Sequence, residues 1–221
     1  ELPHARLVAE SLGAEHHEIV VSPEQWLAAW PKMVYQEDEP IAHPSSIPLH
    51  FVSKLAAGEV KVVLTGEGAD ELLAGYERYY QTLVNLRFGK FIPGPLRSLT
   101  RTLIDCLPDR FVPKRKAVRT SLYLPCNVES LFLDNYAAFP RWSLTNALQP
   151  RLAGHAVDAV YSQFLDLMEA SNAEHLLDRL LYADIKTYLV ELLMKQDQMS
   201  MSASLESRVP FLDHRLVEFV C

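Results

Sequence analysis

Cysteine is scarce in this chain, which has three thiols in 221 residues. Cys106, Cys126 and Cys221 lie far apart, are odd in number and match no metal-ligand spacing. Disulfide frameworks belong to oxidising compartments, so isolated thiols of this kind are typical of a reducing one. The cysteine content therefore predicts a cytoplasmic protein without structural disulfides.

Long apolar runs are also absent from the sequence. No stretch approaches the ~18 apolar residues of a membrane-spanning helix, and the first residues show no signal-peptide pattern. These absences argue against a membrane partner.

Positive charge is in short supply overall, since the formal net charge is −7 and the pI is about 5.6. This balance argues against a general nucleic-acid binder. The charge is uneven, because residues 1–85 carry five basic and thirteen acidic residues, whereas residues 86–119 carry nine basic and two acidic ones. A solvated, irregular insertion is the favoured interpretation of the basic stretch, and a surface that attracts an anionic acceptor or partner is the alternative.

Hydrophobic residues make up 49% of the chain, which is ample for a core in one or two domains of about 150 residues. Apolar spacing and turn residues predict helices at 3–12, 23–34, 47–57 and 173–195, and strands at 16–21 and 60–64. Gly13 would end the first helix, and Ser22 would cap the second, with Pro23 in its first position. This order of elements predicts an α/β fold with right-handed crossovers.

The segment around the second predicted strand is the most informative part of the sequence. Residues 60–64 form an almost wholly apolar run, which suits a strand covered on both faces in a parallel sheet. The run is followed by two glycines and three carboxylates: Gly66, Glu67, Gly68, Asp70 and Glu71. Glycines allow a tight turn and a close approach to a ligand, and ligands bind at the carboxyl ends of strands in open α/β sheets. Carboxylates crowded at such a point would repel one another unless a metal or a cationic ligand joined them.

Two other interpretations of this segment need weighing. A P-loop is excluded, because neither Gly-Lys-Ser nor Gly-Lys-Thr follows the glycines. A plain glycine turn before a helix stays open, with Asp70 as the cap and acidic residues in the first turn that the helix dipole favours. Bound magnesium is the favoured interpretation of the carboxylates.

Several motifs then resemble one family. Residues 64–71 read Leu-Thr-Gly-Glu-Gly-Ala-Asp-Glu and are followed by Gly75-Tyr76, which is similar to the signature of the asparagine synthetase family, the class B glutamine-dependent amidotransferases. Residues 206–216 read Glu-Ser-Arg-Val-Pro-Phe-Leu-Asp-His-Arg-Leu and resemble the family's second hallmark. Two weaker blocks complete the resemblance, at residues 38–48 and at residues 5–18. The four blocks follow the family's order.

The resemblance implies an ATP-pyrophosphatase type fold, adenine nucleotide α hydrolase-like, with a parallel sheet followed by a mostly helical C-terminal half. The family's ATP-binding loop (Ser-Gly-Gly-x-Asp-Ser), its glutaminase domain and its downstream segment with a catalytic lysine do not occur in this sequence. The chain is therefore expected to be part of the synthetase domain of a larger protein. Three segments are expected: an α/β part at 1–84 with the Gly-Glu-Gly-Ala-Asp-Glu loop, an irregular, partly basic helical region at 85–170, and a helical segment with the second hallmark at 171–221.

The activity that the resemblance implies has two steps. ATP adenylates a carboxylate, by default that of aspartate, with loss of pyrophosphate, and ammonia derived from glutamine then attacks the acyl-adenylate to give an amide. Asp70 would hold Mg²⁺ on pyrophosphate, and Glu67 would serve the attack of the amine. Gly66 and Gly68 would let the backbone approach the nucleotide. The implied cofactors are ATP and Mg²⁺.

Five further residues are expected to bind substrate or nucleotide: Glu71, Ser46, Lys195, Asp197 and Arg208. For Ser46 the alternative is a helix cap. For Lys195, Asp197, Glu206 and Arg208 a structural ion-pair network is equally open.

The acceptor carboxylate and the partners are less sharply specified. The chain has His43-Pro44-Ser45 where some asparagine synthetases carry an arginine, and Asp197-Gln198 where Asp-Arg is often found. Amidation or cyclisation of another carboxylate is therefore an alternative, as is a non-catalytic scaffold or regulatory homologue. The expected partners are small-molecule substrates and the glutaminase domain of the same parent, and a homodimer stays open. The chain alone is expected to be inactive.

Overall fold

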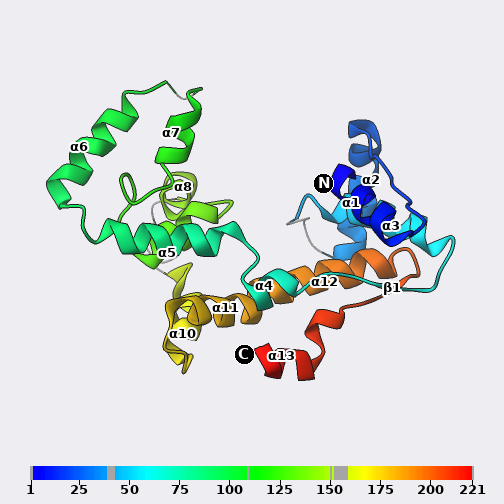
Figure 1. Cartoon of the computed structure of the whole chain (residues 1–221). Coiled ribbons are helices and arrows are strands. Elements are labelled where there is room, and N and C mark those ends of the chain that lie inside the picture. Colours follow the sequence, from blue (N-terminus) through cyan, green and yellow to red (C-terminus); the bar gives the residue numbers. More distant parts are fainter. Residues whose placement is uncertain (1, 39–42, 109, 150, 152–158, 221) are drawn as a thin grey trace. The chain divides into compact units, whose positions relative to one another are not determined.

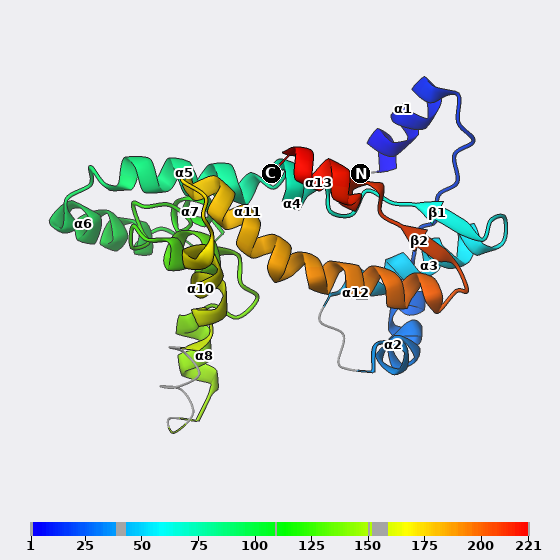
Figure 2. The same cartoon turned by 90° about the horizontal axis from the view of Figure 1, so that it is seen from below.

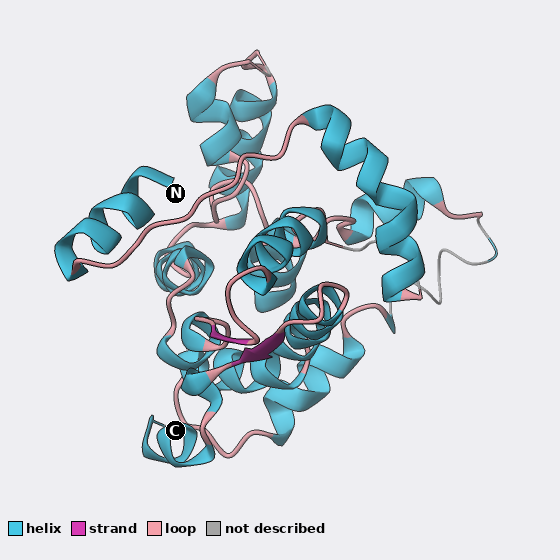
Figure 3. Ribbon diagram, turned by 90° about the vertical axis from the view of Figure 1, so that its right-hand side faces the viewer, coloured by secondary structure: helices cyan, strands magenta, loops and turns pink. Residues whose placement is uncertain are grey.

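The computed structural model describes residues 2–38, 43–108, 110–149, 151 and 159–220, apart from the side chain of Trp142. The chain divides into two compact units, which we call the first unit (Glu1–Gly68 with Leu189–Cys221) and the second unit (Ala69–Tyr188). Helices make up most of the described residues, with a small sheet (Figure 3). None of the described helices is both long and apolar enough to cross a membrane.

The first unit contains three N-terminal helices, two strands and the C-terminal turns. Its elements are α1 (Leu2–Leu12), α2 (Pro23–Glu37), α3 (Ser46–Ala57), β1 (Val62–Leu64), most of α12 (Tyr188–Met201), β2 (Glu206–Arg208), the 3-10 turn η2 (Pro210–Leu212) and α13 (His214–Val220) (Figure 1).

Capping residues fix where the first helices begin and end. Gly13 has a φ of +63° directly after α1, a conformation that costs glycine little. Ser22 and Gln25 form a capping box at the start of α2, with Pro23 in the first turn. The predicted cap residues and the three predicted helices in this region are thereby confirmed.

The strand predicted at 16–21 is wrong, because the segment has irregular backbone. Its polar side chains bond one another and α1 instead of extending a sheet. Arg6 donates to Glu18 at 2.7 Å, and the ring of His16 lies 3.2 Å from the same carboxylate. A strand needs a neighbouring strand to pair with, which an alternating apolar pattern does not guarantee, and no described strand pairs with this segment.

The small sheet joins the two hallmark motifs of the sequence. Strand β1 runs parallel to β2, with Val62 opposite Glu206 and Leu64 opposite Arg208 (Figure 2). The expectation that the 60–64 strand would be covered on both faces is wrong, since Val62 is 40% and Leu64 71% exposed. β1 has one neighbour among the described strands, so its apolar side chains are left largely in solvent.

The core of the first unit lies between α2, α3 and α12. Met33, Ile47 and Met199, one from each helix, are fully buried against one another, with partly buried Trp26 and Phe51 beside them. His50 of α3 bonds Ser202 just after α12 through its Nδ1, 2.6 Å from the serine Oγ. These contacts place α3 next to the C-terminal end of α12.

The described part of the second unit contains helices and turns and no strand. Its elements are α4 (Ala69–Leu73), α5 (Glu77–Gly89), α6 (Gly94–Asp105), α7 (Val112–Ala117), the π-helical turn η1 (Glu129–Asp134), α8 (Arg141–Ala147), α10 (Ser162–Ala170) and α11 (Leu176–Lys186). Its core contains Tyr79, Phe132, Phe164, Met168 and Leu180. The basic stretch at 86–119 is thus mostly helical, not the irregular insertion that its prolines favoured. The expected division at residues 84 and 170 stays a prediction.

The single long helix predicted at 173–195 is two helices. Thr187, between α11 and α12, has φ −124° and ψ −76°, outside the helical region. Its Oγ1 donates to the carbonyl of Ala183 at 2.7 Å, a local bond that competes with the helix ladder. The leucine stripe continues across the break, so hydrophobic spacing could not reveal it.

Candidate active site

The loop after β1 connects the sheet to α4 through a glycine that no other residue can replace without strain. Gly68 has a φ of +89° and is buried. A Cβ built on Gly68 would lie 2.5 Å from Cδ2 of Leu212 in η2, closer than any real carbon contact. Gly66 has no atom within 4 Å of such a Cβ, so its predicted closeness to a nucleotide stays a prediction.

Glu67 and Lys195 are brought together by the packing of the first unit. The Nζ atom of Lys195, on α12, lies 3.8 Å from Oε1 of Glu67. The lysine side chain is only 11% exposed and that of Glu67 25%. A cation this close to a carboxylate can also attract further negative charge, such as that of a ligand. Both residues were predicted for the site, and the structure places them as a pair.

Asp70 and Glu71 lie in the first turn of α4, where their charges suit the helix dipole. Asp70 does not cap the helix as one interpretation held, because α4 already begins at Ala69. Its carboxylate is held close to Gly75, since a Cβ on Gly75 would lie 2.0 Å from Oδ1 of Asp70. Glycine at 75 therefore keeps the space in which the Asp70 carboxylate lies.

Glu71 differs from the other carboxylates in being buried, with 1% exposure. The hydroxyl of Tyr76 donates to Oε1 of Glu71 at 2.5 Å. Burial, and then the bond to Glu71, raises the pKa of Tyr76 above its usual range, so the phenol stays a donor. This bond fixes Glu71 within the second unit, and its predicted contact with a ligand stays a prediction.

Ser46 faces a small cavity in the first unit. The cavity holds about 30 Å³, enough for one or two waters, and Ser46 lines it with Glu37, His43 and Lys195. The interpretation of Ser46 as a helix cap is wrong, because Ser45 occupies the N-cap position and Ser46 is the first residue of α3. Its Oγ is fully buried and has no hydrogen-bond partner among the described residues. Such a hydroxyl is free to bond a ligand or a water.

The remaining predicted residues do not form one ion-pair network. Arg208 donates to Glu206 at 2.7 Å, two positions away on β2, and both side chains are exposed. Asp197 is exposed on α12, and none of the described ion pairs includes it. Lys195 pairs with Glu67 instead. Binding roles for Asp197 and Arg208 stay predictions.

A largely buried arginine of the second unit was not recognised from the sequence pattern. Arg78, at the start of α5, lies among aromatic rings, 4.9 Å from the centroid of Tyr76 and 4.7 Å from that of Tyr188. Its Nη2 donates to Asp184 of α11 at 2.6 Å, and the Tyr79 hydroxyl donates to the same carboxylate oxygen. The available signal was Asp184 itself, a charge within the leucine stripe of α11. The network positions α5, and with it Tyr76 and Glu71.

The described residues contain no group of three histidine, cysteine, aspartate or glutamate side chains arranged to hold a metal ion by themselves. A metal at Asp70 would take further ligands from outside these side chains, such as water or substrate phosphates. Mg²⁺ commonly binds in this way, through one or two carboxylates and substrate phosphates. The exposed Asp70 fits that manner of binding.

The family model and the similar proteins that match this chain all point to the same family. The asparagine synthase family model matches residues 1–221. A putative glutamine-hydrolysing asparagine synthetase of Mycobacterium tuberculosis is 37% identical over 96% of this chain and 32% of its own length. Asparagine synthetase 1 of Bacillus subtilis is 34% identical over 96% of this chain and 33% of its own length. Asparagine synthetase 3 of the same organism is 30% identical over 99% of this chain and 29% of its own length. The chain thus spans about a third of the length of these relatives, and no solved structure matches it significantly.

Proposed function

Because this chain belongs to the asparagine synthase family, we propose that it supplies part of the synthetase domain of an ATP-dependent amide-forming ligase. In the proposed reaction ATP adenylates a carboxylate, that of aspartate by default, and pyrophosphate leaves. Ammonia derived from glutamine in a glutaminase domain of the same protein then displaces AMP and forms the amide. The relatives' names as glutamine-hydrolysing asparagine synthetases support this assignment.

The observation that carries the proposal is the Glu67–Lys195 pair next to the carboxyl end of β1. An amine that attacks an acyl-adenylate must lose a proton, and a positioned carboxylate such as Glu67 can take it. Negative charge develops on the carbonyl oxygen and on the departing AMP in the same step. A lysine held a few ångströms from the base can stabilise that charge.

Asp70 is the residue proposed to hold Mg²⁺. Bound there, the ion would neutralise charge on the departing pyrophosphate. The contribution of the chain is the position of this carboxylate in the first turn of α4, which the space at Gly75 makes available. Glu71, which accepts a hydrogen bond from Tyr76, is proposed to hold the first turn of α4 in place.

The unpartnered hydroxyl of Ser46 supports a role in binding the acceptor, because it lines a cavity that Lys195 also lines. The acceptor need not be aspartate. His43 lies 3.0 Å from Glu191 in this region, where some family members carry an arginine, so the local charge differs from theirs. Amidation or cyclisation of another carboxylate is therefore the second candidate function.

The test uses the full-length parent protein with Glu67→Gln. We expect formation of the amide from ATP, aspartate and glutamine to fall by about 10²-fold, because a general base contributes on the order of 10²–10⁴. ATP–pyrophosphate exchange, which reports adenylation alone, should change by no more than a few fold. The exposed Glu59→Gln is the matched control and should leave both assays unchanged.

An equal loss in both assays would contradict the assignment of Glu67 as the base for the amine. If the unaltered protein shows exchange only with a carboxylate other than aspartate, the second candidate function replaces the first. No exchange with any carboxylate would indicate the non-catalytic homologue.

A further inference from the structure

A large pocket lies within the second unit, formed by residues that belong to none of the family motifs. It has a volume of about 910 Å³ and is open to solvent on one side. Its walls come from α6, the segment 118–125, η1, the residues that connect η1 to α8, and the start of α8. Pockets of about 300–1,000 Å³ are typical of small-molecule sites.

The pocket has walls that side chains hold in place. Segment 118–125 is tied to α6 by Arg97, whose Nε donates to the Ser121 carbonyl at 3.0 Å, and by Thr100, whose Oγ1 donates to the Leu122 carbonyl at 2.7 Å. Asn135, at the end of η1, donates to the carbonyl of Arg119 at 3.1 Å. Bonds on both sides of the segment indicate that the pocket is preformed.

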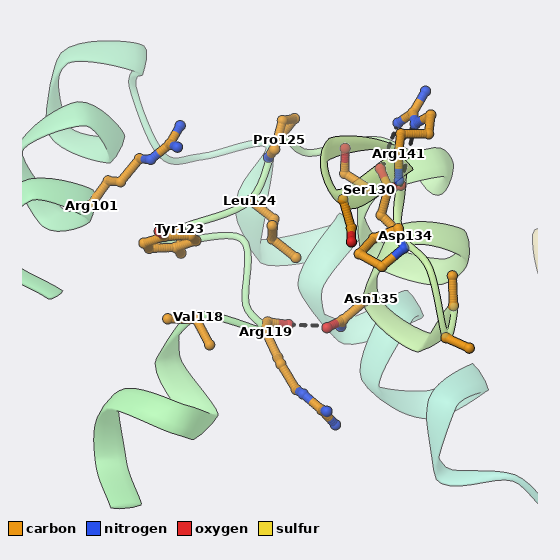
Figure 4. Close-up of a pocket in the computed structure, with 14 residues that line it drawn as sticks. Arg101, Val118, Arg119, Tyr123, Leu124, Pro125, Ser130, Asp134, Asn135 and Arg141 are labelled. Atoms are coloured by element: carbon orange, nitrogen blue, oxygen red, sulfur yellow. Dashed lines mark hydrogen bonds and ion pairs between the residues drawn. The ribbon is translucent and has the colours of Figure 1, made fainter. Parts of the chain in front are cut away.

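The charges that line the pocket are balanced on one side only. In Figure 4, Arg141 and Asp134 lie together on one side, and Arg101 lies beside Tyr123 on the other. Arg141 donates to Asp134 at 2.7 Å, so that side carries no net charge. Among the described residues, no carboxylate pairs with Arg101, whose guanidinium lies 5.2 Å from the Tyr123 ring centroid, or with Arg119.

Apolar groups cover much of the wall between these two sides. They are Val118, Leu124, Pro125, Ala137 and Pro140. A ligand in this pocket would therefore meet the guanidinium groups of Arg101 and Arg119 and an apolar surface. The Asp105 carboxylate, which accepts from the Tyr123 hydroxyl at 2.8 Å, forms no described ion pair with either arginine. Guanidinium groups bind carboxylate and phosphate through paired N–H donors, and an apolar wall favours a hydrocarbon body.

We propose that this pocket binds a small organic anion that has a carboxylate or phosphate group on an apolar body. Arg101 and Arg119, whose side chains lie apart in Figure 4, would each attract the anionic group, and the valine, leucine and proline side chains would contact the body. The excess of basic residues at 86–119 would draw such an anion toward the pocket. The site is distinct from the Gly66–Glu71 loop in the residues that form it.

The test is calorimetric titration of the full-length parent with four probes. They are 2-naphthoate, 1-naphthyl phosphate, the neutral 2-naphthalenemethanol and inorganic phosphate. We expect one or both aromatic anions to bind at least tenfold more tightly than the neutral probe and than inorganic phosphate. The stronger of the two anions identifies whether the pocket prefers carboxylate or phosphate.

Variants then assign the binding to the pocket. Arg101→Gln and Arg119→Gln should each weaken binding of the preferred anion at least threefold, and the double variant at least tenfold. Arg87→Gln, which removes an equal charge from an exposed position on α5, is the matched control and should leave affinity unchanged. Glu67→Gln should also leave it unchanged, because that residue belongs to the other site.

Three results would overturn the proposal. They are equal affinity for the neutral probe, undiminished binding by the double variant, and an equal loss in the Arg87→Gln control. Because both arginines are exposed, the variants are expected to fold, and unchanged thermal unfolding midpoints verify this.

Discussion

The three carboxylates of the loop after β1 have three different environments. Glu71 is buried under the Tyr76 hydroxyl, Glu67 is partly buried beside Lys195, and Asp70 is exposed in the first turn of α4. Three similar carboxylates thus become a hydrogen-bonded acceptor, a carboxylate paired with a lysine and a carboxylate open to solvent. Each environment leads to a different expectation for substitution.

Asp70→Asn in the full-length parent should reduce ATP–pyrophosphate exchange by at least tenfold and raise the Mg²⁺ concentration that the reaction needs. The amide keeps the shape of the side chain but removes the charge that attracts the ion. Exchange measured across a Mg²⁺ series reports this directly. A rate and a Mg²⁺ dependence equal to those of the unaltered protein would exclude Asp70 from metal binding.

Gly75→Ala should also reduce ATP–pyrophosphate exchange, although it replaces no carboxylate. The added methyl group would lie 2.0 Å from Oδ1 of Asp70 and must push that side chain aside. We expect exchange to fall by a factor similar to that of Asp70→Asn, with little loss of stability because Gly75 is exposed and has an ordinary φ. Gly94→Ala, where no atom lies within 4 Å, is the control and should behave as the unaltered protein. Normal exchange in Gly75→Ala would show that the position of Asp70 is not critical.

Most residues of the candidate site could be predicted from the sequence, but the pairing of Glu67 with Lys195 could not. Glycines and carboxylates adjacent in the chain reveal the loop, because a turn and its charges are local features. Lys195 meets Glu67 only through the packing of α12, and nothing near either residue encodes that contact. The burial of Glu71 is likewise a property of Tyr76 and the core beneath it.

Among the elements, α5 and α11 are joined by a buried charge. Asp184 accepts from Arg78 and from Tyr79, and its side chain is 3% exposed. Removing one member of a buried ion pair leaves the other uncompensated, which costs more than the pair itself contributes. The consequence can be measured by comparing single and double variants.

Asp184→Asn should destabilise the chain by about 3 kcal/mol, within the range for a broken buried pair. Adding Arg78→Met to it should restore most of the loss, because no charge then stays buried without a partner. Urea unfolding followed by circular dichroism gives both values. If the double variant is less stable than the single one, the pair is stabilising in its own right.

The predictable and the unpredictable elements differ in what determines them. The capping box at Ser22 and the left-handed Gly13 are set by residues within one turn, so the ends of α1 and the start of α2 could be predicted. The break at Thr187 and the irregular 16–21 segment depend on bonds that the apolar pattern does not contain. The exposure of β1 depends on the number of strands beside it, and the sequence of β1 itself does not contain that information.

At the scale of the whole molecule, the described sheet has two strands, and the sequence contains no Ser-Gly-Gly-x-Asp-Ser string. In the proposed function an ATP site needs the phosphate-binding N–H donors of that loop as well as the Gly66–Glu71 loop. The 221-residue chain should therefore bind ATP weakly, since each charge-assisted bond contributes about 1.5–3 kcal/mol and about 1.4 kcal/mol is a tenfold change in affinity.

Calorimetric titration of the isolated chain with ATP and Mg²⁺ tests this, and we expect a dissociation constant above the millimolar range. The full-length parent under the same conditions is the comparison and should bind at least a hundredfold more tightly. Micromolar binding by the isolated chain would show that the nucleotide site lies elsewhere than proposed.

The close packing of Gly68 against Leu212 has a consequence for how this protein can diverge. Gly68 belongs to the loop motif and Leu212 to the Pro-Phe-Leu-Asp motif, so a substitution in one motif restricts which substitutions the other tolerates. A lineage that lost the glycine would first have to shrink the leucine, and even then the left-handed backbone would disfavour a side chain. Losing Gly68 would therefore require a change at Leu212 first, and the later change at Gly68 would still be harmful. We expect such a pair of mutations to be rare. We expect the two motifs to be inherited together even where the loop carboxylates Glu67 and Asp70 have been lost.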